Sequence, residues 1–226
     1  MAKASKVSAF VVLDRSGSMS GSRWENAIGA INTYVAGLVE DGAKGDITVT
    51  AFDSGMSYTN TIANNIGQMN SSANLEVLRD KVDFKNYKSI EINECTPRGG
   101  TPLYDATATV IDRATASKNA RKIVLIMTDG EENSSREYNL TSIRAKIEKC
   151  KADGWEVIFL GAEFNVDRMA TSMGVDLSKT VSVGDKARFG STMRSYSTAT
   201  MNYANMGTAI DTTALRSTEA QQAKTV

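Results

Sequence analysis

The segment Phe10-Val11-Val12-Leu13-Asp14-Arg15-Ser16-Gly17-Ser18-Met19 joins an apolar run to a turn rich in side-chain oxygens. The apolar run is typical of a strand that is buried on both faces of a parallel sheet. Ligands of open α/β sheets bind beyond the carboxyl ends of the strands, so Asp14, Ser16 and Ser18 indicate a cation site there. The alternative is a Gly/Ser turn that caps the next helix, because Asp and Ser also favour turns and N-caps.

A second apolar run, residues 123–127, ends in the same way. It leads into Asp129 of a Thr-Asp-Gly sequence, so Asp129 would lie beside Asp14 if the two strands are neighbours. Two carboxylates about 5 Å apart repel by roughly 3 kcal/mol at an effective dielectric of about 20. Such a pair therefore needs a cation, a proton or an arginine. Arg15 and Arg98 are the candidates for a purely structural salt bridge.

Between these two strands, residues 96–103 read Thr-Pro-Arg-Gly-Gly-Thr-Pro-Leu, a loop that opens a helix. Gly99 and Gly100 allow the backbone to approach a ligand closely, and Thr101 offers another hydroxyl. Hard divalent cations such as Mg²⁺ take carboxylate, hydroxyl and water oxygens, whereas zinc and copper favour His and Cys. The chain has no His, which favours Mg²⁺ and removes the Ser-His and Cys-His pairs of many hydrolases.

These motifs resemble the metal-ion-dependent adhesion site (MIDAS) of von Willebrand factor type A (vWA) domains. The matching residues are Asp14-x-Ser16-x-Ser18, Thr101 in a Gly-Gly-Thr-Pro-Leu loop and Asp129 in Thr-Asp-Gly, and the similarity covers about residues 7–183. The resemblance implies a Rossmann-like α/β fold, doubly wound, with a mostly parallel central sheet and helices on both faces. It adds one antiparallel edge strand, which we expect within residues 57–66.

The resemblance also implies a complete set of metal ligands. Hydroxyl oxygens would come from Ser16, Ser18 and Thr101, and acidic oxygens from Asp14 and Asp129, directly or through water. Mg²⁺ is the expected ion, with Mn²⁺ and Ca²⁺ as alternatives. In that family a carboxylate of a partner protein commonly completes the coordination shell. The resemblance therefore implies a protein-binding module without chemistry of its own, of an intracellular bacterial or phage type.

Two other classes of function compete with the binding module. A Mg²⁺-dependent phosphoryl-transfer enzyme would use a strand-end aspartate as phosphate acceptor. Such enzymes usually carry a second acidic residue beside the nucleophile, where this chain has Arg15 and Ser16. In the other alternative, a structural or assembly subunit, the ion would only stabilise the fold.

Composition predicts an ordinary globular domain. The 226 residues are 41% hydrophobic and 23% charged, and we expect a vWA domain over residues 1–206 with a polar, flexible tail over 207–226. Lys plus Arg equals Asp plus Glu at 26 each, which gives no reason to expect nucleic acid. The short polar amino terminus predicts no signal peptide, no membrane partner and a cytoplasmic location. Oligomeric state stays open.

Hydrophobic periodicity predicts alternating strands and helices, which implies a parallel sheet covered on both faces. Trp24 is expected in the core, Cys95 and Cys150 as free thiols, and Asp53 as a loop residue. Charges just beyond Asp129, at Glu131 and Glu132, are interpreted as solvated. Besides residues 10–13 and 123–127, the expected strands are residues 47–52, 88–92, 157–161 and 180–183; the expected helices follow Asp14 and cover residues 75–82, 103–116, 141–151 and 165–173, with a last helix carrying Met193, Tyr196, Tyr203 and Met206.

Overall fold

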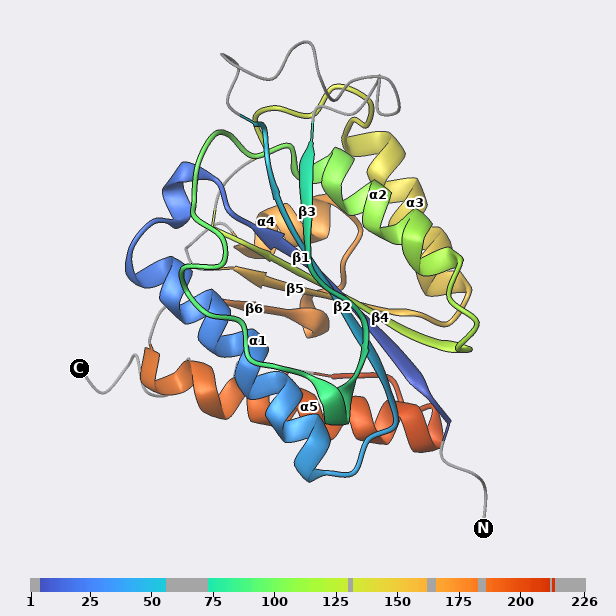
Figure 1. Ribbon diagram of the computed structural model, residues 1–226. Helices are drawn as coiled ribbons and strands as arrows, with labels where there is room; N and C mark the ends of the chain where they lie inside the picture. Colours follow the sequence, from blue (N-terminus) through green and yellow to red (C-terminus); the bar gives the residue numbers. More distant parts are fainter. Residues whose placement is uncertain are drawn as a thin grey trace, which may run out of the picture.

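The computed structural model describes residues 5–55, 73–129, 132–161, 166–182, 186–211 and 213. Within these residues a six-stranded sheet has the order β3-β2-β1-β4-β5-β6 (Figure 1). Every neighbouring pair is parallel except β2 and β3, so the predicted sheet with one antiparallel edge strand is confirmed. The strands are β1 (Val7–Asp14), β2 (Gly45–Asp53), β3 (Asn74–Asp83), β4 (Arg121–Thr128), β5 (Glu156–Gly161) and β6 (Thr180–Ser182).

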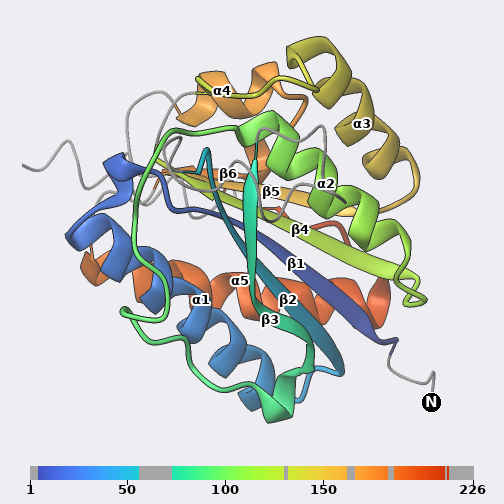
Figure 2. The same ribbon diagram turned by 45° about the horizontal axis from the view of Figure 1, so that its top comes forward.

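Helices cover both faces of the sheet, as the doubly wound arrangement requires. Figure 2 shows α1 and α5 on one side of the sheet and α2 and α3 on the other. The α-helices are α1 (Ser22–Glu40), α2 (Leu103–Thr115), α3 (Leu140–Ala152), α4 (Val166–Ser172) and α5 (Lys186–Met206). None of the helices in the described ranges is both long and apolar enough to cross a membrane.

The central strand β1 explains why its sequence is apolar without interruption. Alternate side chains point to opposite faces of a strand, and both faces of β1 are covered. Ala9, Val11 and Leu13 pack in the core beneath α1 and α5. Phe10 and Val12 pack in the core beneath α2 and α3. Every residue of β1 is consequently buried, which is the pattern of a central parallel strand.

The strand order reverses direction at β1, and this reversal positions the candidate site. The chain leaves β1 toward α1 on one face and leaves β4 toward α3 on the other. Leu13 pairs with Met127 in parallel register, so Asp14 and Asp129 reach the same edge of the sheet. Ligands of doubly wound sheets bind at such a switch point, beyond the carboxyl ends of the strands.

Strand β3 corrects one prediction. Residues 75–82 were expected to be helical but form most of the antiparallel edge strand. The register of β2 with β3 shifts between Ile47 and Val49 and again between Val49 and Thr50, which breaks the two-residue alternation. Leu75 consequently packs in one core, and Leu78 and Val82 pack in the other. In the sequence, Leu75, Leu78 and Val82 have the spacing of residues on one face of a helix. The edge strand expected within residues 57–66 falls outside the described residues.

Residues 88–92 are not a strand, contrary to expectation. The side chain of Asn32 on α1 holds this segment: its Oδ1 accepts from the Ile90 N–H at 2.9 Å, and its Nδ2 donates to the Ile90 carbonyl at 3.0 Å. Nearby, Trp24 is buried as expected, with its indole N–H donating to the Ile92 carbonyl at 3.0 Å. Hydrogen bonds from the side chains of Asn32 and Trp24 to the backbone of this segment therefore anchor it to α1.

The carboxyl-terminal helix matches the prediction in three of four residues. Met193, Tyr196 and Tyr203 of α5 are buried, whereas Met206 is 67% exposed and the core role expected for it is wrong. Ile210, beyond the end of α5, is also buried in the core. The boundary between residues 206 and 207 and the flexibility of the tail stay predictions, and residues 214–226 lie outside the described part. Cys95 and Cys150 are both free, as expected.

Candidate metal centre

Asp14 is the last residue of β1, and its side chain is buried at the switch point. Its Oδ1 accepts a hydrogen bond from the Ser16 backbone N–H at 2.7 Å, and its Oδ2 accepts one from the Thr128 hydroxyl at 2.6 Å. Burial raises the pKa of Asp14 from 3.8 to about 6, although the hydrogen bonds from Thr128 and Ser16 oppose the rise. Both donors are neutral, so the Asp14 carboxylate is held firmly but poorly solvated.

The turn after β1 brings the two serines to Asp129. Ser16 and Ser18 lie on either side of Gly17 at the start of a short 3-10 turn, with their hydroxyl oxygens 3.0 Å apart. The Ser18 hydroxyl donates to Asp129 Oδ1 at 2.8 Å, across 111 residues of sequence. Side-chain oxygens from the loops after β1 and β4 thus converge, as the parallel pairing of these strands predicts.

The loop that carries Thr101 is pinned against this turn. The Gly17 N–H donates to the Gly99 carbonyl at 3.0 Å, and the Arg98 N–H donates to the Arg15 carbonyl at 2.7 Å. Thr101 itself is buried. The bond from Gly17 to Gly99 therefore brings the threonine loop to the two serines, and three separate loops meet at this edge of the sheet.

The arginines next to the motifs do not neutralise Asp14 or Asp129. Arg15 Nε lies 2.5 Å from Asp53 Oδ2, and Arg98 Nε lies 3.1 Å from the same oxygen. The interpretation of Asp53 as a loop residue is wrong, because it is the last residue of β2 and is fully buried. Both arginines are held beside the candidate site by this third strand-end aspartate.

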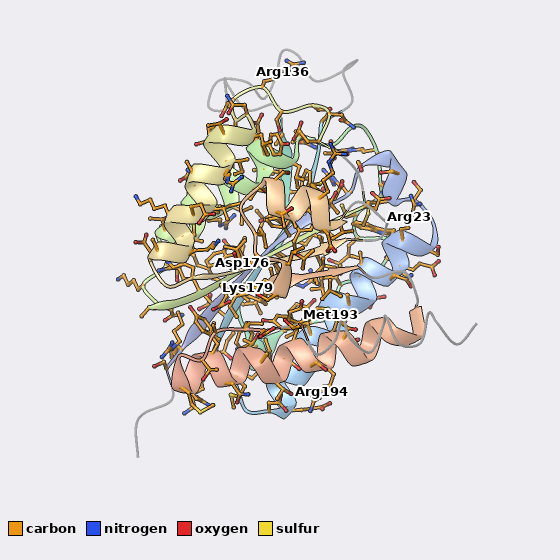
Figure 3. The ribbon with its side chains drawn as sticks, turned by 180° about the vertical axis from the view of Figure 1, so that it is seen from behind. Arg23, Arg136, Asp176, Lys179, Met193 and Arg194 are labelled. Carbon is orange, nitrogen blue, oxygen red and sulfur yellow. The ribbon has the colours of Figure 1, made fainter. Side chains whose placement is uncertain are left out.

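Arg23, a residue that sequence reasoning missed, contacts the site directly. Its guanidinium Nη1 donates to Asp129 Oδ2 at 2.8 Å and to the Ser18 carbonyl at 3.1 Å. Figure 3 shows Arg23 near the start of α1. Because Arg23 and Asp129 lie 106 residues apart, no local pattern could have revealed the pair. Thr128 was also missed, although its position just before Asp129 on a strand beside β1 is a usable signal.

The sequence of the chain matches a known protein family. The family model described as von Willebrand factor type A domain matches residues 10–180 of the chain. The chain belongs to the von Willebrand factor type A family. Comparison with curated protein sequences finds no match to this vWA chain.

Solved structures share the vWA fold at low sequence identity. The vWF domain of the type V pili tip protein Mfa5 from Porphyromonas gingivalis is 11% identical, with a TM-score of 0.65, covering 92% of this chain and 99% of that one. The pilus adhesin SpaC from Lactobacillus rhamnosus GG is 12% identical, with a TM-score of 0.63, and the match covers 89% of this chain and 30% of SpaC. A von Willebrand factor type A protein from Catenulispora acidiphila is 17% identical, with a TM-score of 0.61. The present chain spans 43% of that protein and is 88% covered by the match.

The two glycines of the vWA threonine loop allow close approach, but to neighbouring loops. Gly99 has a φ of +69°, and a Cβ there would lie 2.9 Å from the Ser54 hydroxyl. A Cβ on Gly100 would lie 2.6 Å from the Ser134 hydroxyl and 2.9 Å from Asn133 Oδ1. The positive φ of Gly99 therefore requires glycine, whereas a side chain at Gly100 would force the Ser134 and Asn133 side chains to move.

The loop after β4 is held in place by the half-buried side chain of Glu132. Glu132 accepts hydrogen bonds from the backbone N–H groups of Ser134 and Ser135 at 2.8 and 2.6 Å, so its interpretation as a solvated charge is wrong. Asn133 Oδ1 in turn accepts from the Thr101 N–H at 2.8 Å. This loop therefore supports the threonine loop. Glu131 lies outside the described residues.

The donor set fits a hard cation. In the part of the chain that the structure describes, no three His, Cys, Asp or Glu side chains form a metal cage. An ion at this vWA site would depend on serine and threonine hydroxyls together with Asp14 and Asp129. Oxygen-only donors of this kind suit Mg²⁺, Mn²⁺ or Ca²⁺ better than zinc or copper.

Proposed function

We propose that this vWA domain is a metal-dependent protein-binding module. A Mg²⁺ would bind at the switch point and would bridge to an acidic side chain of a partner protein. The observation that carries the proposal is the hydrogen-bonded convergence of Ser16, Ser18 and Asp129 next to the buried carboxylate of Asp14. The proposed ligands are Asp14, Ser16, Ser18, Thr101 and Asp129.

The chemistry of these donors favours an acidic partner. Three of the five proposed ligands are neutral hydroxyls, which leave much of the charge of a divalent ion uncompensated. Ser18 is exposed, so the site reaches the surface on the side of the serine turn. An ion with a free coordination position there would attract an anionic oxygen, and a Glu or Asp side chain of another protein fits that requirement.

The solved relatives support a binding role over an enzymatic one. SpaC is described as a pilus adhesin and Mfa5 as a type V pili tip protein. At 11–12% identity these structures share only the fold with this chain. The guanidinium of Arg15, which stands where a phosphoryl-transfer enzyme would use a second carboxylate, is paired with Asp53.

Calorimetric titration of EDTA-treated protein with MgCl₂ tests the metal site. Ser18→Ala removes a proposed ligand, and Ser20→Ala is its matched control. Both serines are exposed in the same turn, but the Ser20 hydroxyl donates to the Gly17 carbonyl at 2.8 Å instead of facing Asp129. We expect Ser18→Ala to weaken Mg²⁺ binding at least about tenfold and Ser20→Ala to leave it unchanged. Equal affinities in all three proteins, or no binding by wild type, would contradict the proposal.

Partner capture tests the binding role. Immobilised wild-type protein is incubated with an extract of the native host in Mg²⁺ and in EDTA, with Asp14→Ala in Mg²⁺ as control. We expect one or more proteins to be retained by wild type in Mg²⁺ alone. Retained proteins then need an Asp or Glu whose substitution abolishes binding. An identical set of proteins under all three conditions would count against metal-bridged binding.

A further inference from the structure

Both oxygens of the Asp129 carboxylate accept hydrogen bonds from the protein itself. Its Oδ1 accepts from the Ser18 hydroxyl at 2.8 Å, and its Oδ2 accepts from Arg23 Nη1 at 2.8 Å. The Asp129 side chain is 0% exposed, whereas the Arg23 side chain is 39% exposed. A buried carboxylate is thus covered on its outer side by a half-exposed guanidinium.

The helix α1 itself does not favour an arginine at position 23. Arg23 is the second residue of α1, and the amino-terminal turn of a helix carries partial positive charge that disfavours a cation. The cost to the helix is offset by the charge-assisted hydrogen bond to Asp129 and by the bond to the Ser18 carbonyl. The role of Arg23 therefore lies at the candidate metal centre.

We propose that Arg23 is the internal counter-ion of the metal centre. In the metal-free protein its guanidinium occupies the Asp129 carboxylate, and a divalent ion must displace it to bind there. This inference rests on the proposed function. The displacement is physically reasonable because the ion and the guanidinium repel each other, while the half-exposed side chain has a long flexible stem that reaches water.

The counter-ion has opposite effects on the two states of the protein. Without metal, Arg23 neutralises a buried charge that would otherwise be unpaired, and it stabilises the fold. With metal, the same pairing has to be broken first, so Arg23 lowers the affinity for the ion. Removing its charge should therefore tighten metal binding and destabilise the metal-free protein at the same time, a combination that loss of a mere structural contact would not produce.

Arg23→Gln tests this coupling, with Arg194→Gln as the matched control. Arg194 is an arginine of similar exposure, 42%, that pairs with Glu40 and Asp41 at the far end of α1; Figure 3 labels both arginines. MgCl₂ is titrated into each EDTA-treated protein by calorimetry. We expect Arg23→Gln to bind Mg²⁺ about fivefold more tightly than wild type, and Arg194→Gln to bind with wild-type affinity.

Thermal melts in EDTA provide the second readout. Arg23→Gln should lower the Tm of the metal-free protein. In an Asp129→Asn background the same substitution should lower the Tm less, because the carboxylate that Arg23 pairs with has already been replaced by a neutral amide. Arg194→Gln should lower the Tm equally in both backgrounds. Equal effects of Arg23→Gln in both backgrounds would overturn the inference.

The titration outcomes separate this inference from the proposed function. If wild type binds Mg²⁺ and Arg23→Gln binds it equally or more weakly, the counter-ion role is overturned while the metal site stands. If Arg23→Gln binds Mg²⁺ and wild type does not, the counter-ion role of Arg23 is supported, while the proposed function of the wild-type protein is contradicted. If neither protein binds Mg²⁺, the proposed function fails, and the inference fails with it.

Discussion

Asp14→Asn should separate the stability of this protein from its metal binding. The carboxylate of Asp14 is fully buried and accepts hydrogen bonds from two neutral donors. Asparagine has nearly the same shape and keeps an acceptor for the Ser16 N–H, while the Thr128 hydroxyl can rotate to accept from the new amide. The substitution therefore removes a charge and a proposed metal ligand with little change in packing.

The magnitude follows from the pKa of the buried carboxyl. Burial raises the pKa of Asp14 from 3.8 to about 6, and each unit corresponds to 1.36 kcal/mol. Keeping Asp14 ionised in the metal-free fold thus costs about 3 kcal/mol at neutral pH. Because the folded-state pKa is the higher one, the protonated carboxyl has its full stability below pH 4, and stability is lost as the pH rises through 6.

Urea unfolding in EDTA measures this cost. At pH 7.5 we expect Asp14→Asn to be more stable than wild type by about 1–3 kcal/mol, and at pH 4 the difference should largely disappear. In Mg²⁺ at pH 7.5 the advantage should shrink or reverse, since wild type alone would gain stability from the ion. If the variant is less stable than wild type in EDTA at pH 7.5, the reasoning about the buried charge is refuted.

Further predictions concern the stability of the fold and the effect of the ion on it. Asp53→Asn weakens the pairing with Arg15 and Arg98 and should lower the free energy of unfolding by about 3 kcal/mol in urea titrations; an unchanged midpoint would contradict the anchoring role of Asp53. Gly99→Ala places a Cβ against Ser54 in a backbone with φ of +69°, and should lower the free energy of unfolding by about 1–2 kcal/mol. As a control, the Cβ of Gly29→Ala in α1 meets nothing within 4 Å, and this substitution should raise the free energy of unfolding by up to about 1 kcal/mol. Mg²⁺ at about a hundred times its Kd should stabilise wild type by about 2.7 kcal/mol relative to EDTA, and identical melting curves in Mg²⁺ and EDTA would argue against a bound ion.

Features that depend on local sequence were predictable. A strand covered on both faces is apolar at every position, so residues 10–13 and 123–127 indicated β1 and β4 without any structure. Because parallel strands end at a common edge, the oxygens after each strand were expected to meet, and Ser18 does donate to Asp129. Whether these residues bind a metal stays a prediction.

Features that depend on tertiary pairing were not predictable. The apolar residues of 75–82 are spaced as in a helix, and the irregular register between β2 and β3 accommodates this spacing in a strand. The buried state of Asp53 comes from two arginines in other loops. Arg23 gave no signal, since a basic residue at the start of a helix reads as solvent-exposed until the fold brings Asp129 to it.

Crystals grown in MnCl₂ would test the central claim most directly, because Mn²⁺ substitutes for Mg²⁺ and its anomalous scattering locates the ion. We predict one strong anomalous peak at the switch point, at a bonding distance of about 2.1 Å from the Ser16 and Ser18 hydroxyl oxygens, with Arg23 withdrawn from Asp129. A peak elsewhere, or none at this site in millimolar Mn²⁺, would contradict the account.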